Sequence, residues 1–403
     1  MMSEIEIEPL MAALERRLEV TSVDYHRPLY GTLDWDDRLV CIKGAKGTGK
    51  TTLMLQFLKE HPEELEKSIY VSLDNLWFAN HSPLEVVDWL HNNGGTRLLL
   101  DEVHHFKSWQ TLIKNIYDDY PKLKIIYSGS SMMKLNAEGG DLSRRQRQYE
   151  LKGLSFREYL AFEGVATFST VGLDELLRNH RKIARSVVSK LPVLRYFKNY
   201  LKSGYYPFYK SARNGYHDRI AQVVKQTLER DWPETEEVTL ATIKKTEKML
   251  MILAASCPQV PNMNELYDEL ETDRNQGMKM LAALERAGLL SLLSSKTANL
   301  GNMSRPDKIY CDNTNLMSAL SPVVNVGTIR ETFFLNQLKT SGHLVVYPPK
   351  GDFKVDGKFL FEIGGKGKTF KQIADLPDSY VVNDDTEIGL GNKIPLWLFG
   401  FLY

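Results

Sequence analysis

The sequence predicts an α/β fold, in which a parallel sheet covered by helices is followed by helical segments and a small mixed α/β segment. Apolar runs at 38–43, 68–73, 97–103 and 123–128 alternate with helical patterns, which is typical of such sheets. A glycine-rich string follows the first run, and two adjacent carboxylates end the third. Open α/β sheets bind ligands at the carboxyl ends of their strands, so we expect the site there.

The glycine-rich string has the pattern G-x-x-x-x-G-K-[ST] between a strand and a helix. It reads Gly44, Ala45, Lys46, Gly47, Thr48, Gly49, Lys50 and Thr51, and Thr52 continues into the helix. Its backbone N–H groups are expected to surround a phosphate chain at a helix N-terminus. Lys50 would reach the β- and γ-phosphates, and Thr51 would offer its hydroxyl to Mg²⁺. The expected cofactors are therefore ATP and Mg²⁺.

Length and composition are typical of a globular protein with several domains. The 403 residues are 43% hydrophobic and 25% charged, and we expect about two to four domains. No apolar run approaches the ~18 residues of a membrane span, and the acidic start does not resemble a secretory signal. We therefore expect a cytoplasmic protein without a membrane partner.

The cysteines and the net charge argue against further classes. Cys41, Cys257 and Cys311 lie far apart without C-x-x-C pairing, so neither a disulfide framework nor a zinc site is indicated. The 51 basic and 51 acidic side chains give a net charge of zero. The whole molecule therefore has no electrostatic bias toward nucleic acid, although a local basic face stays open.

Beyond residue 151 the pattern becomes helical to about residue 235. Three helical segments then occur within 243–293, followed by a β-hairpin at 289–293 and 308–311, and this order suggests a winged helix. The remaining chain predicts a mixed α/β unit. Its expected elements are helices at 328–340 and 369–374 and strands near 343–347, 353–355, 358–363, 379–383 and 394–401.

The third apolar run ends in Asp101 and Glu102. Adjacent strand residues face opposite ways, so the two carboxylates can have different tasks. Asp101 is expected to hold the Mg²⁺ shell, and Glu102 to orient or deprotonate the water that attacks the γ-phosphate. The second carboxylate favours hydrolysis over binding alone.

Further polar groups are expected around this pair. The fourth run ends in small hydroxyls at 128–131, of which Ser130 is our candidate for the γ-phosphate or its water. Arg144 and Arg145 are candidates to stabilise charge on the transferring phosphoryl group, from the same or a neighbouring subunit. His104 and His105 follow the acidic pair, and without further ligands we expect a polar role rather than metal binding.

Taken together, these motifs resemble the prokaryotic AAA+ superfamily ATPases that carry a C-terminal restriction-endonuclease-like domain. The resemblance covers nearly the whole chain and rests on residues 44–51, 98–105, 128–131, 143–145 and 151–159. It implies an N-terminal helical segment (1–37), an AAA+ P-loop ATPase core (38–155), a helical lid (156–239), a winged helix (240–322) and a PD-(D/E)xK-type domain (323–403).

The resemblance also implies a second metal site in the terminal domain. It places Glu331 on the first helix, Asp352 or Asp356 before the central strand, and Glu362 on that strand. The family spacing expects a lysine two residues after the glutamate, where this chain has Gly364, and Lys366 follows two residues later. We therefore favour a degenerate site on a scaffold that binds a partner or nucleic acid over a site that cuts DNA.

The expected function is an intracellular AAA+ ATPase that binds and hydrolyses Mg·ATP and couples hydrolysis to movement of the winged-helix and nuclease-like domains. One alternative is an ATP-gated scaffold or signalling switch that recruits a protein or DNA. Another is an ATP-regulated DNA nuclease. DNA would bind through the winged helix, near Arg274, Lys279 and Arg286, and through the terminal domain. An arginine acting across an interface would require a homo-oligomer.

Overall fold

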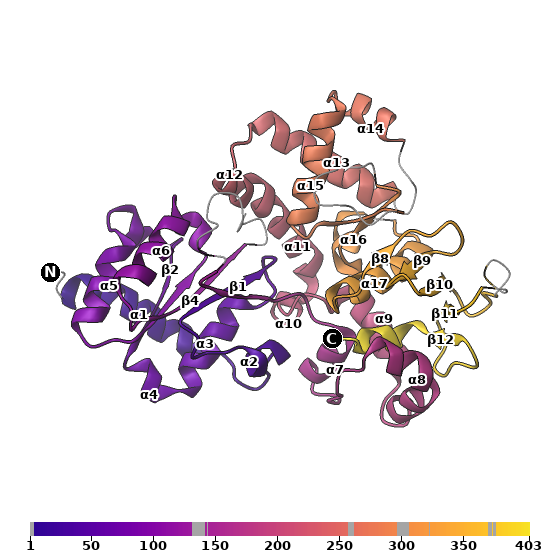
Figure 1. The fold of residues 1–403 in the computed structure, drawn as a ribbon, viewed down its shortest axis with the longest axis horizontal. Helices are drawn as coiled ribbons and strands as arrows, with labels where there is room; N and C mark the ends of the chain where they lie inside the picture. Colours follow the sequence, from indigo (N-terminus) through magenta and orange to yellow (C-terminus); the bar gives the residue numbers. More distant parts are fainter. Residues whose placement is uncertain are drawn as a thin grey trace. The chain divides into compact units, whose positions relative to one another are not determined.

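The computed structural model describes residues 4–130, 142, 144–256, 262–295, 306–321, 323–369, 373 and 376–403. The chain forms two compact units (Figure 1). Unit 1 contains Met1–Lys152 and Gln226–Val238, and unit 2 contains Gly153–Lys225 and Thr239–Tyr403. The first unit is therefore interrupted by a segment that folds with the second.

Unit 1 is built on a parallel sheet, as the sequence predicts. Its described residues form five strands in the order β2-β3-β4-β1-β5, and every neighbouring pair is parallel. The strands are β1 (Leu39–Gly44), β2 (Ser68–Ser72), β3 (Arg97–Asp101), β4 (Lys124–Ser130) and β5 (Arg147–Glu150). The α/β prediction is confirmed.

Helices cover both faces of this sheet, because alternate residues of each strand point to opposite sides. In β1, Leu39 and Cys41 belong to one apolar cluster, whereas Val40 and Ile42 belong to another. Residues of α5 and α6 join the first cluster, and residues of α3 join the second. The helices of this part are α1 (Glu4–Val20), α2 (Pro28–Thr32), α3 (Lys50–Glu60), α4 (Pro62–Leu65), α5 (Pro83–Asn92) and α6 (Trp109–Asp119), with short 3₁₀ turns η1 (Leu76–Ala79) and η2 (Val103–His105).

Helix α5 begins where its sequence signals predict. Ser82 and Glu85 form a capping box, and Pro83 occupies the first turn, where its missing N–H costs no hydrogen bond. Its apolar face contributes Val86 and Val87 to the core. Local capping and burial therefore agree on the position of this crossover.

The last part of unit 1 comes from much later in the chain. A π-helical turn, η4 (Thr227–Asp231), continues into the short helix α12 (Trp232–Thr235). Thr227, Leu228, Asp231 and Trp232 are buried. Single π-helical turns occur often at functional sites, and this one brings Asp231 to the loop at 44–51.

Unit 2 combines helices with a second, mixed sheet. Its described strands follow the order β12-β11-β10-β9-β8, in which β10, β11 and β12 are parallel and β8 and β9 are antiparallel to their neighbours. These strands are β8 (Val345–Val346), β9 (Phe353–Val355), β10 (Phe359–Gly364), β11 (Ser379–Asn383) and β12 (Lys393–Pro395). One apolar core contains Phe156 and Phe197 together with Phe334, Phe361 and Phe399.

Along the chain, helices of unit 2 come both before and after a small β-hairpin. Strands β6 (Leu290–Leu293) and β7 (Lys308–Cys311) pair antiparallel, as predicted. The helices are α7 (Phe156–Phe162), α8 (Leu173–Val188), α9 (Val193–Ser203), α10 (Tyr209–Ala212), α11 (Tyr216–Gln226), α13 (Leu240–Ser256), α14 (Met263–Glu269), α15 (Arg274–Arg286), α16 (Thr314–Leu320) and α17 (Val326–Thr340), with 3₁₀ turns η3 (Arg213–Gly215) and η5 (Leu396–Phe401). The winged-helix assignment and the domain boundaries remain predictions.

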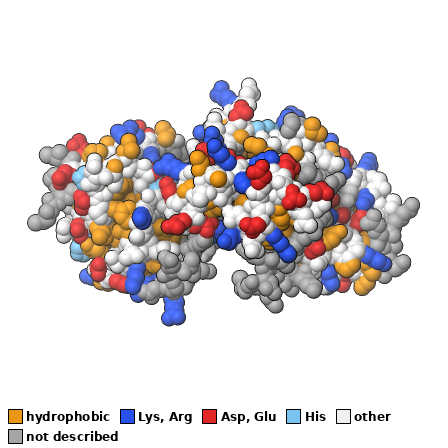
Figure 2. All heavy atoms as spheres, turned by 90° about the horizontal axis from the view of Figure 1, so that it is seen from above, with side chains coloured by type: hydrophobic (Ala, Val, Ile, Leu, Met, Phe, Trp, Pro, Cys, Tyr) orange, Lys and Arg blue, Asp and Glu red, His pale blue; other side chains and the backbone are white. Residues whose placement is uncertain are grey.

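The strand predicted at 394–401 is wrong over most of its length. Only Lys393–Pro395 forms a strand, and Leu396–Phe401 forms the buried 3₁₀ helix η5. Most of the helix expected at 369–374 lies outside the described residues. Within the described ranges, no helix combines the length and apolarity required to cross a bilayer. Figure 2 shows acidic and basic side chains interspersed on one face of the molecule.

Candidate functional site

The loop at 44–51 owes its path to glycine. Gly47 and Gly49 have φ angles of 85° and 102°, which other residues rarely adopt, and Gly49 precedes the first turn of α3. A Cβ atom on Gly44 would collide with the carbonyl oxygen of Leu151. Arg27 supports the loop from outside, because its guanidinium donates to the carbonyl oxygens of Thr48 and Lys152 at 3.0 and 2.9 Å.

The structure brings the predicted lysine and magnesium ligands to this loop. Lys50 is buried, and its Nζ donates to the carbonyl oxygens of Gly44 and Ala45 at 2.9 and 3.2 Å. Thr51 Oγ1 donates to Asp101 Oδ2 at 2.6 Å. A hydroxyl and a carboxylate in contact beside the loop are the hard oxygen donors that suit Mg²⁺. Thr52, in contrast, is exposed.

Asp101 is held by side chains from the two neighbouring strands, in addition to Thr51 on α3. Tyr70 on β2 donates its hydroxyl to Asp101 Oδ2 at 2.7 Å, and Ser128 on β4 donates to Oδ1. Arg17 in turn donates to the Tyr70 oxygen at 2.9 Å. Burial and the negative charge of Asp101 raise the pKa of Tyr70 far above its ordinary value, so the phenol stays a donor. Asp101 is therefore fixed in one orientation at the end of β3.

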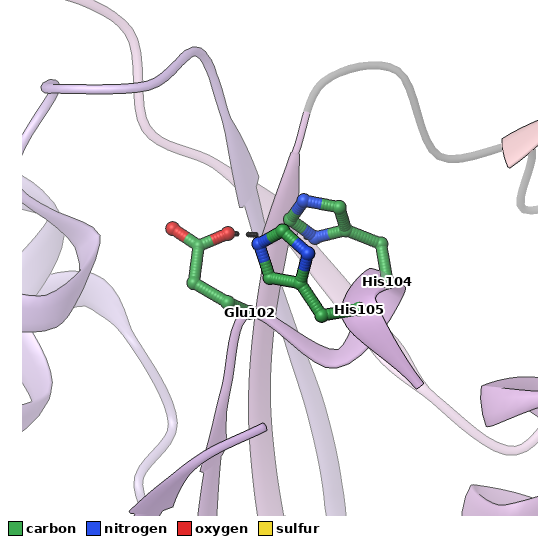
Figure 3. Close-up of side chains that lie close together, drawn as sticks. All are labelled: Glu102, His104 and His105. Carbon is green, nitrogen blue, oxygen red and sulfur yellow. Dashed lines mark ion pairs between the residues drawn. The ribbon is translucent and has the colours of Figure 1, made fainter. Parts of the chain in front are cut away.

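Glu102 turns away from this arrangement. Its φ of 52° is left-handed, which is uncommon for glutamate, and its N–H donates to Asp101 Oδ1 at 3.1 Å. Its carboxylate forms an ion pair with His104, with 3.4 Å between Oε2 and Nδ1 (Figure 3). The backbone nitrogen of Ser130 lies 3.3 Å from the same His104 nitrogen, which accepts this N–H when it carries no proton and pairs with Glu102 when the ring is protonated. The predicted base and the predicted serine thus meet at a histidine.

The π-helical turn supplies residues that sequence reasoning missed. Asp231 lies 3.5 Å from Lys46 Nζ and 3.8 Å from His104 Nε2. Glu234 Oε2 lies 2.5 Å from His105 Nδ1. Burial raises the pKa of Asp231, but His104 and the charge of Lys46 outweigh this effect and lower the pKa overall. Nothing in the sequence around 227–235 marks these acids, because only the fold brings them to the loop.

Arg144 and Arg145 are the arginines predicted to stabilise charge on the phosphoryl group. Arg145 forms an ion pair with Asp118 at the end of α6, with 3.4 Å between the charged atoms, and lies over the Tyr117 ring. Arg144 is exposed. Arg145 thus contacts α6, and a phosphate-directed role for either arginine remains a prediction.

A second polar cluster lies in unit 2. Glu331 on α17 accepts from Tyr310 at 2.7 Å and pairs with Lys308 at 3.3 Å, while Asp352 lies 3.9 Å from Lys308. Glu362 on β10 is buried and pairs with Lys368 at 2.5 Å. Lys308 thus bridges the predicted carboxylates Glu331 and Asp352, whereas the predicted Glu362 has its own partner in Lys368.

The glutamate in this cluster is electrostatically perturbed. Burial and the negative charges of Asp352 and Glu331 raise the pKa of Glu362, although Lys368 opposes the shift. The pKa of Lys368 is also raised, because its pairing with Glu362 outweighs desolvation. Each group therefore depends on the other for its charge.

The lysine in this cluster differs from the one chosen from the sequence. Lys366 is exposed, whereas Lys368 N–H donates to the Gly365 carbonyl oxygen at 2.9 Å in a turn that brings its side chain back to Glu362. A Cβ atom on Gly364 would lie 2.7 Å from the Lys368 side chain. The glycine at the expected lysine position therefore makes room for Lys368. Asp356 lies apart and contacts His343 at 2.7 Å.

Comparison with known proteins supports the nucleotide-binding assignment. Residues 36–160 match the family model described as an AAA domain, and residues 194–326 match a model described as a domain of unknown function. The uncharacterized protein MJ1637 of Methanocaldococcus jannaschii is 26% identical over 370 residues, covering 83% of this chain and 77% of that protein. The AAA domain match and the geometry of the loop together support an AAA+ ATPase.

Similar solved structures include nucleotide-bound replication initiators. The initiator DnaA bound to AMPPCP and single-stranded DNA is 16% identical, with a TM-score of 0.27, and the alignment covers 69% of this chain and 87% of that chain. AMPPCP-bound DnaA from Aquifex aeolicus is 18% identical, with a TM-score of 0.27, over 71% of this chain and 88% of that chain. TM-scores of this size carry no inference about function.

Proposed function

We propose that unit 1 hydrolyses Mg·ATP at the loop 44–51. The contact between Thr51 and Asp101, at 2.6 Å beside the buried amine of Lys50, carries this proposal. Hydroxyl, carboxylate and ammonium groups in this arrangement are those that P-loop ATPases use for a nucleotide triphosphate. The AAA domain match over residues 36–160 supports it independently.

Binding the phosphates requires Lys50 to exchange partners. Its amine now contacts the carbonyl oxygens of Gly44 and Ala45, and phosphate oxygens would be stronger acceptors for the same ammonium. Thr51 and Asp101 would hold Mg²⁺, whose chemistry there is to neutralise charge on the β- and γ-phosphates. The N–H groups of the loop add a fixed positive potential.

Activation of water requires Glu102 to leave His104. The carboxylate lies at the end of β3, next to Asp101, but pairs with His104 Nδ1 at 3.4 Å. A rotation of its side chain would free an oxygen to accept a proton from water near the γ-phosphate. We assign Glu102 the role of general base and His104 that of its resting partner.

Two variants test this assignment. Lys50→Ala should lose nucleotide binding, measured with a fluorescent ATP analogue. Glu102→Gln should keep binding but lose at least ~100-fold in turnover, since general bases contribute roughly 10²–10⁴-fold. Glu66→Gln, at an exposed position on the same unit, is the matched control. Equal turnover in wild type and Glu102→Gln would remove Glu102 from the mechanism.

Coupling of the ATPase to the rest of the chain is part of the proposal. Residues 226–238 belong to unit 1, but the chain on both sides of them belongs to unit 2. Because Asp231 contacts Lys46 in the loop, a change at the loop reaches unit 2 through the backbone. This connection supports an ATPase that moves its other domains, and it equally supports a switch that recruits a protein or DNA. We include in the same proposal that the chain forms a homo-oligomer that depends on ATP.

A second candidate function is metal-dependent cleavage of DNA in unit 2. It is favoured by Glu331 and Asp352, which share Lys308, and by the buried Glu362, which pairs with Lys368 and whose pKa the charges of both other carboxylates raise. Carboxylate oxygens suit Mg²⁺, and a lysine beside them can position water or stabilise charge. Lys368 replaces the lysine that the spacing lacks, so the site has the groups that such chemistry requires.

Labelled DNA incubated with Mg²⁺ or Mn²⁺ tests this second function. We expect cleavage by wild type and by the control Lys366→Ala, and at least a tenfold loss in Glu362→Gln and Lys368→Ala. Unchanged cleavage in Glu362→Gln would assign the activity to another site or a contaminant. No cleavage by wild type, with and without ATP, would leave a scaffold that binds but does not cut.

A further inference from the structure

A cluster of nitrogen and oxygen donors lies beside the nucleotide loop. Glu102, His104 and His105 each offer one ligand atom, and these atoms lie within 4.8 Å of one another. Figure 3 shows the two imidazole rings and the carboxylate converging from the end of β3 and from η2. In the part of the chain that the structure describes, this is the one such group of three side chains.

One separation between ligand atoms is close to that of a zinc centre. Ligand bonds of 2.0–2.1 Å in tetrahedral geometry place neighbouring ligand atoms about 3.3 Å apart. Glu102 Oε2 and His104 Nδ1 are 3.4 Å apart. The His104 and His105 ring centroids are 4.3 Å apart. Small side-chain rotations would complete the geometry, and a metal bond at His104 Nδ1 would replace its 3.3 Å contact with the Ser130 N–H.

Each histidine also has a carboxylate behind it. Asp231 faces His104 Nε2 at 3.8 Å, and Glu234 faces His105 Nδ1 at 2.5 Å. Histidines that bind metals almost always direct their second ring nitrogen to a carboxylate, a carbonyl or water, which fixes the ring and strengthens the ligand. This arrangement leaves His104 Nδ1 and His105 Nε2 for a metal.

Burial distinguishes this cluster from a surface histidine pair. The side chains of His104 and His105 are 0% and 5% exposed, whereas Glu102 is 19% exposed. Among the described residues, His104 Nε2, His105 Nδ1 and Asp231 Oδ1 have no hydrogen bond of good geometry, so their contacts with one another and with Glu234 are close approaches of charged groups and not formed hydrogen bonds. Buried polar atoms in this state are costly, and a metal that orders the rings would reduce that cost.

The donor set selects the class of metal. Imidazole nitrogens favour zinc and neighbouring transition metals, whereas Mg²⁺ prefers an all-oxygen shell. With three protein ligands a tetrahedral metal keeps one position open. The cluster therefore differs in chemistry from the Thr51 and Asp101 pair.

We propose that Glu102, His104 and His105 bind Zn²⁺ or a similar divalent transition metal, and that the bound metal holds Glu102 away from the attacking water. The site would then act as an inhibitory metal sensor of the ATPase. The proposal of metal binding depends only on the positions of these three side chains. The proposal of inhibition depends also on the proposed function, in which Glu102 is the general base.

The binding half is tested without nucleotide, on the tag-free full chain. Co²⁺ should give the intense visible absorption of a four-coordinate site at one equivalent, and Zn²⁺ should displace it. His105→Gln and Glu102→Gln should each weaken Zn²⁺ binding at least tenfold in a chelator competition. His81→Gln, which removes a half-buried histidine paired with Glu85, should bind as wild type does. Equal affinity in wild type and His105→Gln, with both folded by circular dichroism, would overturn the proposal.

The inhibition half is tested by ATP turnover at fixed Mg²⁺ with increasing Zn²⁺. Wild type and His81→Gln should lose turnover at the zinc concentration that fills the site, and His105→Gln should require at least ten times more. Equal zinc sensitivity in all three would refute inhibition through this site. If wild type shows no turnover even without zinc, the proposed ATPase fails, whereas the binding result still decides the metal site.

Discussion

Lys46 and Asp231 form an ion pair of 3.5 Å between the phosphate-binding loop and a π-helical turn far along the chain. The carboxylate is 2% exposed and the lysine 27% exposed. Removing one partner of a largely buried pair leaves a charge without compensation, which costs more than the pair itself contributes. The contact therefore ties residues 226–238 to the sheet of unit 1.

Asp231→Ala should consequently destabilise unit 1. We expect a loss of about 1–3 kcal/mol, the usual cost of leaving a buried polar group unsatisfied. Urea unfolding followed by fluorescence measures this loss, and faster proteolysis within 226–238 should accompany it. Asp119→Ala, at an exposed position in the same unit, should leave the urea midpoint unchanged. A midpoint for Asp231→Ala equal to that of wild type would contradict the role of the ion pair.

Gly44→Ala should damage the loop, whereas Gly31→Ala should not. A Cβ atom at 44 collides with the Leu151 carbonyl, but at 31 it meets nothing within 4 Å. Forcing an extra carbon into a packed site costs about 1–3 kcal/mol. Thermal unfolding and binding of a fluorescent ATP analogue give the two measurements. Full nucleotide affinity in Gly44→Ala would show that the backbone can shift without consequence.

Tyr70→Phe should alter the dependence on Mg²⁺. The change removes the hydroxyl that donates to Asp101 at 2.7 Å, and thereby loosens the carboxylate that we assign to Mg²⁺. Because outer partners of metal ligands typically contribute 10–100-fold in affinity, we expect the Mg²⁺ concentration for half-maximal turnover to rise about tenfold. Tyr149→Phe, which removes a hydroxyl contact to the Asp34 N–H, is the control. An unchanged Mg²⁺ profile would argue that Asp101 needs no support from β2.

His180 should make unit 2 sensitive to mild acid. Burial lowers the pKa of His180, whose Nε2 faces the Gly391 carbonyl oxygen at 2.9 Å, and the charge of Arg181 acts in the same direction. A histidine pKa lowered in the folded state means that the unfolded chain takes up the proton first. Stability is then complete above pH ~6.5 and falls as the pH decreases toward the folded pKa, by at most about 1.4 kcal/mol per pH unit.

His180→Gln should flatten that pH dependence. Glutamine does not titrate and can still donate to the Gly391 carbonyl oxygen. Urea midpoints between pH 7.5 and 5.5 should decrease less in His180→Gln than in wild type. His217→Gln, at a half-buried position on α11, should keep the wild-type slope. Parallel slopes for wild type and His180→Gln would exclude this histidine as the source.

The sequence located the parts of the site that depend on local chain order. The loop at 44–51 and the acidic end of β3 carry their chemistry in adjacent residues, so spacing alone identifies them. Asp231 and Glu234 could not be found in this way, because their role depends on packing between distant segments. For the same reason, the sequence alone did not show which acids lie next to His104 and His105.

Two further differences between the sequence-based predictions and the structure have local causes. The family spacing falls on Gly364, so the sequence offered Lys366 as the next lysine, whereas β10 ends at Gly364 and a turn brings Lys368 back to Glu362. Residues 396–401 are almost continuously apolar and fully buried, and such a run does not distinguish a strand from a short helix. Burial was predictable in that segment, but backbone conformation was not.

The interruption of unit 1 has a consequence for how the protein is made. Chains fold as they leave the ribosome. The sheet at 39–150 therefore emerges before residues 226–238, the last portion of unit 1, have been translated. Until then Lys46 and His104 lack the acid that accompanies them in the finished protein. The surroundings of the loop at 44–51 are therefore completed only after 73 intervening residues, Gly153–Lys225, have been synthesised.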